Sequence, residues 1–169
     1  MSLEIAKDAV ICYDSYMKGA IKIGFKTIIH PKSKIYANGG QILFGDHNIV
    51  EELCVITNKN KSDDNIHPLM IGSNNIFHLG TNCTASRIGN NNIFEYKCII
   101  DPEVEIGNHC VIGARCHIRG PMIIPNNTII YGNPPKSYRH NDDIQPQILQ
   151  IDLLSKVLPK YHNIIPSNL

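Results

Sequence analysis

The sequence has no tryptophan, few aromatic residues and almost no excess of charge of either sign. Sixteen Lys and Arg side chains stand against 15 Asp and Glu, which leaves a formal net charge of +1. Without a basic or acidic excess there is no electrostatic reason to expect binding to nucleic acid or to a membrane surface. No apolar run is long enough to span a bilayer. We therefore expect no nucleic-acid partner and no membrane insertion.

The N-terminal residues MSLEIAKDAVICYD lack the basic start and the unbroken apolar core of a secretion signal. The six cysteines are scattered along the chain, and none forms a C-x-x-C pair. Reduced thiols in a cytoplasmic protein are therefore the expected state. The length of 169 residues suits one domain with a real core.

What the sequence does contain is a repeat, because an apolar residue returns every six positions, with three shifts of phase. These residues are Ile5, Ile11, Met17, Ile23, Ile29, Ile35, Phe44, Val50, Ile56, Ile71, Phe77, Cys83, Ile88, Phe94, Ile100, Ile106, Ile112, Ile118, Ile124 and Ile130. A period of six fits neither an amphipathic helix nor an alternating hairpin. It predicts an all-β fold, a single-stranded left-handed parallel β-helix of about seven coils in residues 1–132.

Two other positions of the repeat are also regular. Glycine follows the core residue of the first face in five coils, where the backbone needs close approach: Gly24, Gly45, Gly72, Gly89 and Gly107. Asn48, Asn75 and Asn92 fill one corner in three successive coils, where amide side chains can hydrogen-bond along the stack. We assign both features structural roles.

The residue before each core residue of the second face should point outward, and in all seven coils it is aliphatic. These residues, the apolar stripe, are Val10, Ile28, Ile49, Ile76, Ile93, Val111 and Ile129. The stripe is roughly 33 Å long at the usual strand spacing. An exposed apolar surface of that size has to be covered by another element or by a partner.

A C-terminal helix is the first candidate cover, because the period changes after the turn-rich connection 133–143. Ile148, Ile151, Leu154, Leu158 and Tyr161 recur at helical spacing. We expect a helix and tail in residues 144–165.

The expected ends of that helix also follow from the sequence. Asn141, Asp142 or Asp143 could cap its start, and Pro159 should end or kink it near Leu158. A helix of about sixteen residues is about 24 Å long, too short for the whole stripe.

The expected helix has a second row of apolar residues beside the row at helical spacing. The predicted helix-docking or partner-binding flank combines the apolar stripe with the three residues of this second row. Those three residues are Leu149, Leu153 and Val157. Two interpretations stay open: the helix alone covers what needs covering, or a partner binds the remainder. The polar segment 57–69 is predicted to leave the coil as a surface loop, either as a partner contact or as a solvated excursion.

A search for catalytic chemistry finds little. No two coil histidines of one subunit lie close enough to share a zinc ion, which binds nitrogen at about 2 Å. His78 alone could act as a general base, and a site shared between subunits stays open. Cys98 and Cys116 should fill the core, and the acidic residues Glu51, Glu52, Glu95, Asp101 and Glu103 are expected on a solvated surface. We predict no catalytic residue, no metal and no cofactor; the alternative is a homotrimeric enzyme of the acyltransferase or γ-type carbonic anhydrase kind.

The segment IQPQILQIDLLSKVLPKYHN (144–163) strongly resembles the C-terminal helix of the dynactin subunit 6 family. Five coil segments are similar to that family too: TIIHPKSKI (27–35), FGDHNIVEE (44–52), MIGSNNIF (70–77), IGNNNIFEYK (88–97) and IPNNTIIYG (124–132). The resemblance implies a non-catalytic, cytoskeleton-associated subunit of the dynactin pointed-end complex, which supports dynein-driven microtubule transport and cargo selection. It implies as partners dynactin subunit 5, a pointed-end actin-related protein and other dynactin subunits.

Overall fold

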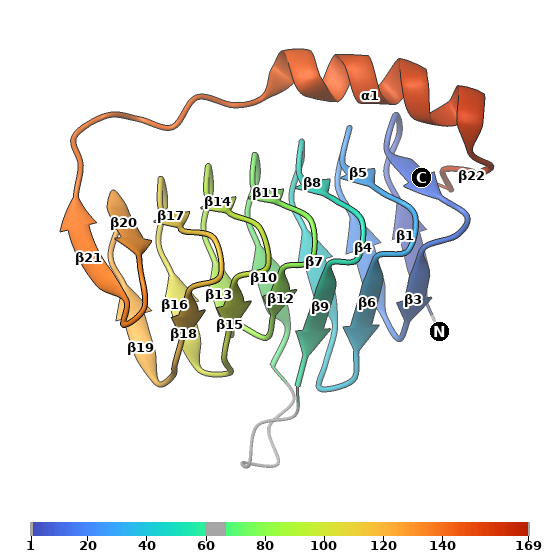
Figure 1. Ribbon diagram of the computed structural model, residues 1–169. Helices are drawn as coiled ribbons and strands as arrows, with labels where there is room; N and C mark the ends of the chain where they lie inside the picture. Colours follow the sequence, from blue (N-terminus) through green and yellow to red (C-terminus); the bar gives the residue numbers. More distant parts are fainter. Residues whose placement is uncertain (1, 60–66, 169) are drawn as a thin grey trace.

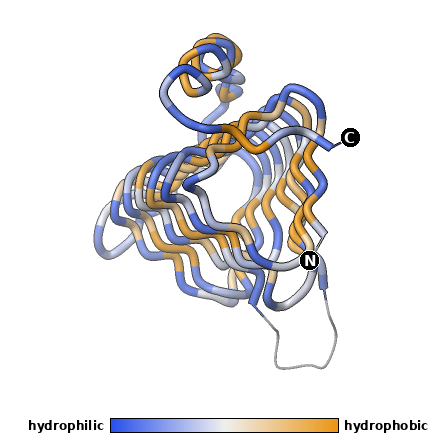
Figure 2. The backbone as a smooth tube through the Cα atoms, turned by 90° about the vertical axis from the view of Figure 1, so that its right-hand side faces the viewer, coloured by the Kyte–Doolittle hydropathy of each residue, from blue (hydrophilic) through white to orange (hydrophobic). Residues whose placement is uncertain are grey.

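The computed structural model describes residues 2–59 and 67–168. Short parallel strands follow one another around a common interior and stack coil upon coil (Figure 1). Seen along the axis, the coils superpose into one prism, with the C-terminal helix lying outside one face (Figure 2). The predicted parallel β-helix of about seven coils with a C-terminal helix is confirmed.

Three sheets form the faces of the prism. Sheet A contains β1 (Leu3–Ile5), β4 (Ile21–Ile23), β7 (Ile42–Phe44), β10 (Leu69–Ile71), β13 (Arg87–Ile88), β16 (Val104–Ile106) and β19 (Met122–Ile124). Sheet B contains β22 (Ile164–Ile165), β2 (Val10–Cys12), β5 (Ile28–Ile29), β8 (Ile49–Val50), β11 (Ile76–Phe77), β14 (Ile93–Phe94), β17 (Val111–Ile112), β20 (Thr128–Tyr131) and β21 (Lys136–Arg139). Sheet C contains β3 (Tyr16–Lys18), β6 (Lys34–Ala37), β9 (Val55–Asn58), β12 (Asn82–Cys83), β15 (Ile99–Ile100) and β18 (His117–Ile118).

The six-residue repeat places its apolar residues in the interior. Ile88 stacks on Ile106 in sheet A, and Phe77 on Phe94 in sheet B. The two phenyl rings are parallel, with centroids 4.5 Å apart. Because stacked coils bury each other's side chains, full burial of each Ile or Phe contributes about 1.5–3 kcal/mol relative to exposure.

The repeated glycines and asparagines explain how the coils approach so closely at one corner. A Cβ on Gly72 would lie 2.5 Å from the carbonyl oxygen of Gly89 in the next coil, which only glycine avoids. The side chain of Asn75 is fully buried and donates to that same Gly89 oxygen at 2.9 Å. The predicted asparagine ladder is therefore present and binds the glycine corner.

A second polar ladder runs along the neighbouring, exposed part of this corner, and the sequence analysis did not predict it. Side-chain oxygens accept hydrogen bonds from backbone N–H groups of the preceding coil. Asn90 Oδ1 accepts from the Ser73 N–H at 2.7 Å, and Asn108 Oδ1 accepts from the Asn90 N–H at 2.7 Å. The members vary in type (Asp46, Ser73, Asn90, Asn108 and Asn126). Because the residue type varies, this ladder does not show up as one residue repeated along the sequence.

Segments outside the coils depart from the sequence prediction. The turn-rich connection 133–143 contains a strand, β21, which pairs antiparallel with β20. The tail contains another, β22, antiparallel to β2. The predicted loop 57–69 is shorter than expected, because β9 extends to Asn58 and β10 begins at Leu69; residues 60–66 of that loop lie outside the described residues.

The helix α1 spans Ile148–Tyr161, so the predicted start was wrong and the helix does not end near Leu158. Its N-cap is Gln147, not one of the residues 141–143, and this cap makes no side-chain hydrogen bond. Pro146 explains the late start, since a residue before proline is disfavoured in the helical region. Pro159 lies inside the last turn and the helix continues to Tyr161, where the His162 N–H donates to the Leu158 carbonyl at 2.9 Å. Within the described residues, no helix is long and apolar enough to cross a membrane.

Candidate functional site

The apolar stripe is continuous, because parallel pairing places its members directly above one another. The helix covers its first four members. Val10, Ile28, Ile49 and Ile76 form a second buried cluster with Cys12, Ile151 and Leu158, against which Leu154 and Ile164 pack. The helix α1 therefore docks on the stripe over these four coils.

The other three stripe members, Ile93, Val111 and Ile129, do not belong to that cluster and are only partly buried. This matches the limited length of α1, which in Figure 1 lies above the N-terminal coils, while an extended segment crosses the C-terminal ones. The structure thus leaves nearly half of the stripe without the helix.

The opposite flank of α1 faces away from the coils. Leu149 is 86% exposed and Leu153 is 61% exposed, four residues apart on one side of the helix, and Val157 follows half-buried. By contrast, Ile151 and Leu158 are buried against the stripe. The ten predicted flank residues thus divide into four covered by α1 and six that are not. We call these six the uncovered flank: Ile93, Val111, Ile129, Leu149, Leu153 and Val157.

Polar contacts fix where α1 and its connection lie. Lys26 forms an ion pair with Asp152 of the helix at 3.2 Å. His109 holds the connection: its Nδ1 accepts from the Ile144 N–H at 3.1 Å, and its carbonyl oxygen lies 2.7 Å from His140 Nε2. The sequence analysis had no signal for this role of His109, because its partners come from an irregular segment.

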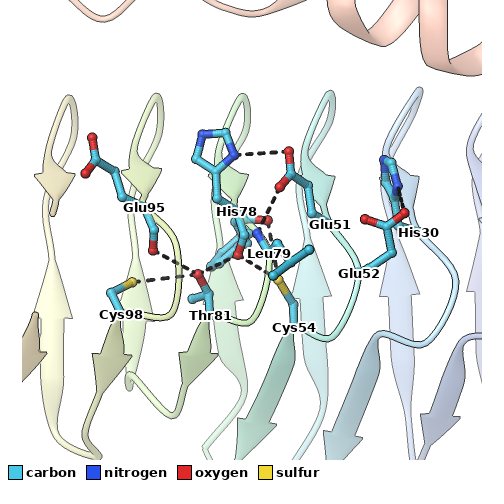
Figure 3. Close-up of polar contacts among 10 residues, drawn as sticks. His30, Glu51, Glu52, Cys54, His78, Leu79, Thr81, Glu95 and Cys98 are labelled. Atoms are coloured by element: carbon cyan, nitrogen blue, oxygen red, sulfur yellow. Dashed lines mark hydrogen bonds and ion pairs between the residues drawn. The ribbon is translucent and has the colours of Figure 1, made fainter. Parts of the chain in front are cut away.

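A row of alternating histidine and glutamate runs along the corner between sheets B and C (Figure 3). His30, Glu51, His78 and Glu95 occupy equivalent positions in successive coils, one after each core residue of sheet B. His78 Nδ1 lies 3.0 Å from Glu51 Oε1, and Glu51 Oε2 accepts from the Leu79 N–H at 2.8 Å. The ring of Tyr96 stacks on His78 at 4.8 Å.

Electrostatics keep Glu51 ionised. Burial acts to raise the pKa of this carboxyl, but the hydrogen bond from His78, the charge of that imidazole and the Leu79 N–H outweigh it, so the pKa of Glu51 is lowered from its usual value. In the neutral tautomer that donates its Nδ1–H to this carboxylate, the His78 Nε2 is an acceptor. An imidazole oriented in this way is the one group of the row that suits general-base chemistry.

Four of the acidic residues expected on a solvated surface are also hydrogen-bonded within the fold. Glu51 pairs with His78, Glu52 with His30 at 3.3 Å, and Asp101 with His117 at 2.8 Å. Glu95 accepts from the Ala114 N–H at 2.9 Å, whereas Glu103 is exposed as expected. In this fold, side chains one coil apart come into contact. The spacing in the sequence alone did not predict these histidine–carboxylate pairs. In the described part of the chain, no three His, Cys, Asp or Glu side chains are grouped so that they could hold a metal ion.

The cysteines are structural residues. All six are free and buried. Desolvation raises the pKa of Cys54, Cys83 and Cys98 to about 12 in each case. Thiols of that kind are not ionised at neutral pH and are poor nucleophiles. Cys98 and Cys116 belong to the main core, as predicted.

Comparison with known proteins begins with a negative result: no protein-family model matches the chain. A hexapeptide transferase family protein from Anaplasma phagocytophilum has a similar crystal structure, with a TM-score of 0.69 at 16% identity over 91% of this chain and 87% of that one. At such low identity, the similarity shows a shared fold and no shared activity.

Sequence relatives are more specific. Dynactin subunit 6 of Danio rerio is 38% identical over 170 residues, which cover 96% of this chain and 87% of that protein. Dynactin subunit 6 of Nematostella vectensis is 39% identical over 172 residues, or 98% and 94% of the two chains. The C-terminal helix and the coil segments that resemble this family thus belong to a likeness extending over nearly the whole chain, and the protein is a member of the dynactin subunit 6 family.

Proposed function

We propose that this protein is a non-catalytic structural subunit of the dynactin pointed-end complex, which supports dynein-driven microtubule transport and cargo selection. Its partners in this proposal are dynactin subunit 5, which is the second β-helical subunit, and the pointed-end actin-related protein. It would act in the cytoplasm, associated with the cytoskeleton. Membership of the dynactin subunit 6 family supports the proposal.

The uncovered flank is the observation that carries this function. Leu149 and Leu153 expose most of their surface on α1, while Ile93 and Val111 continue the stripe beyond the helix. Large apolar side chains left exposed on α1, together with stripe residues beyond the helix, are what an interface with a partner would cover. A structural subunit needs such a surface, whereas a catalytic one needs a pocket with convergent polar groups.

Mutation of the flank tests the proposal. A tagged protein is used to recover partners from a cytoplasmic extract, which are identified by mass spectrometry. The variant carries Leu149→Asp together with Leu153→Asp, and Leu53→Asp is the matched control, since Leu53 is also exposed but lies at a different corner. We expect the wild type and the control to recover actin-related protein and a second β-helical subunit, and the double variant to lose them.

The possible results separate two questions. If the wild type recovers no dynactin component, the proposed function is wrong. If the double variant recovers as much as the wild type, the subunit assignment stands but the helix flank is not the contact. Circular dichroism of all three proteins verifies that each is folded.

One observation favours a second candidate, a homotrimeric hexapeptide-repeat enzyme. His78 is oriented by Glu51 and stacked on Tyr96, as a general base would be. A purified trimer that contains stoichiometric zinc, or that transfers acyl groups from an acyl-coenzyme A, would establish the enzyme. We expect neither.

A further inference from the structure

The last coil of the β-helix is incomplete. It supplies β19 to sheet A and β20 to sheet B, and then the chain reverses into β21, which pairs antiparallel with β20. No third strand is laid over β18. Among the described residues, sheet A therefore ends at β19 and sheet C at β18, both with a free edge. Figure 1 shows β19 and β18 at the end of the prism that carries β21.

The N-terminal end is covered more fully by the protein's own tail. There β22 pairs with β2 in sheet B. In sheet A, Asn168 exchanges hydrogen bonds with the edge strand β1, since its side chain accepts from the Ile5 N–H at 2.6 Å and its own N–H donates to the Ile5 carbonyl at 3.1 Å. At this end, an extended segment of the C-terminal tail thus covers the edge strands of the terminal coil.

The backbone of β19 is oriented to accept such a strand. The Met122 N–H and the Ile124 carbonyl both bond to the preceding coil, to Glu103 and Gly107. Parallel pairing uses alternate residues on alternate sides, so the N–H and C=O of Ile123 point outward along the axis. Unpaired backbone groups of an edge strand form a template for another strand.

Apolar surface surrounds this free edge. Ile123 is 76% exposed and Met122 is 45% exposed. Met122 borders a hollow of about 290 Å³, where the third strand of the coil would begin, and the lining of this hollow includes the core residues Ile118 and Ile130 together with Arg119. A strand laid here would bury apolar side chains as well as pair backbone groups.

The charge at the C-terminal end of the β-helix indicates which kind of strand would bind to the free edges. Residues 107–141 contain Arg115, Arg119, Lys136 and Arg139 but no Asp or Glu. Both flanking segments do contain acidic residues, including Glu103 and Asp142. Within residues 107–141, the formal charge around the terminal coil, from the preceding coil and from β21, is therefore only positive, in a chain of almost neutral net charge. This favours an acidic occupant, because complementary charge raises the association rate and excludes wrong partners.

We propose that the C-terminal end of the β-helix binds an extended segment of a partner protein in which aliphatic and acidic residues alternate, added as a strand to the free edges of β19 and β18. This surface is separate from the uncovered flank and does not depend on the proposed dynactin function. Main-chain hydrogen bonds supply affinity, and alternate side chains supply selection by apolar contact and by charge.

The test uses the peptide EVEIEVE titrated into the isotope-labelled full-length protein at low salt, followed by amide chemical shifts. We expect shifts concentrated in residues 117–124. Two probes separate the contributions: KVKIKVK has the opposite charge, and EVEIEVE methylated at alternate backbone nitrogens keeps its charge but cannot pair as a strand. Neither should bind.

Variants in one outward position of sheet A provide a matched pair. Met70, Arg87, Glu105 and Ile123 pair in this register, so Ile123→Asp changes the free edge while Met70→Asp changes the middle of the same sheet. We expect Ile123→Asp to weaken peptide binding about tenfold and Met70→Asp to leave it unchanged. Arg119→Ala should weaken it as well, with Arg87→Ala as control.

Three results would overturn the inference. The first is absence of binding by EVEIEVE to the wild type. The second is equal binding by the methylated peptide, which would reduce the effect to unspecific charge attraction. The third is a shift pattern centred on α1, which would assign the peptide to the uncovered flank. None of these results bears on recovery of dynactin components, so failure here is distinguishable from failure of the proposed function.

Discussion

The side-chain amide of Asn75 donates a hydrogen bond of 3.0 Å to Asn48 Oδ1 in the preceding coil. The same amide nitrogen also donates to the Gly89 carbonyl at 2.9 Å, and Asn75 Oδ1 accepts from the Asn92 N–H at 3.0 Å. One buried side chain thus binds three successive coils, and every polar atom it carries has a partner. Fully satisfied buried networks of this kind rigidify a core.

Asn75→Leu should therefore destabilise the protein strongly. The substitution leaves the Gly89 carbonyl and the Asn92 N–H buried without these partners, and each orphaned group costs about 1–3 kcal/mol. We expect a loss of about 3 kcal/mol in the free energy of unfolding, measured by urea denaturation. Asn82→Leu is the control, because Asn82 is exposed on β12; its effect should stay within about 0.5 kcal/mol.

Ile106→Asp should prevent folding. Ile106 is 3% exposed and stacks between Ile88 and Ile124 inside the prism. A carboxylate there would have no counter-charge, and burial of an unpaired ion exceeds the total stability of a typical domain. The measurement is the far-ultraviolet circular dichroism of the purified variant or its recovery in the soluble fraction. Ile123→Asp, one residue before Ile124, changes an exposed position and should fold normally; equal behaviour of the two variants would contradict the assigned register.

The repeat could be predicted from the sequence because it depends on one rule applied many times. Each core residue, glycine and corner asparagine was located by its period, and parallel pairing brought the predicted residues together. The helix was visible as a change of period. The docking of Ile151 and Leu158 on the stripe was predictable because both surfaces were apolar and unpartnered in the sequence.

Other features could not be predicted, for a physical reason in each case. β21 and β22 contain no repeat and exist only because terminal coils have free edges. The Glu51–His78 contact joins two successive coils, and an insertion between these coils changes the usual spacing along the sequence. The two residues are therefore 27 positions apart, which the six-residue period does not predict. The late start of α1 depends on Pro146 and on the contacts of His109 with the connection.

The two flanks of α1 predict opposite effects for one type of substitution. Leu158→Ala creates a cavity against the stripe and should cost about 2–4 kcal/mol. Leu153→Ala removes an exposed side chain and should change the stability of the isolated protein little. Thermal unfolding measures both, and hydrogen exchange of the α1 amides reports whether the helix undocks. Equal destabilisation would show that the two flanks are not distinct.

The lowered pKa of Glu51 makes stability depend on pH with a defined sign. A carboxyl whose folded pKa is depressed stabilises the fold above its unfolded value, here near 4.5, and this contribution disappears as the pH falls through the folded pKa. Glu51→Gln should therefore lose about 1 kcal/mol near neutral pH and approach the wild type at acidic pH. Urea unfolding at a series of pH values checks this. Glu103→Gln, at an exposed carboxylate, should show no such convergence; a wild-type advantage that grew toward low pH would refute the assignment.

His78→Ala separates structure from catalysis at the position best suited to chemistry. The variant loses the contact with Glu51 and the stacking on Tyr96, so we expect a destabilisation of about 1–2 kcal/mol. A subunit that acts by binding keeps its partners despite this change, because neither Ile93 nor Leu149 of the uncovered flank is altered. Recovery of partners from an extract should thus equal that of the wild type, in contrast to the Leu149→Asp and Leu153→Asp double variant. Loss of an acyl-transfer activity in His78→Ala, with partners retained or not, would make the row of histidine and glutamate a catalytic site instead of a structural one.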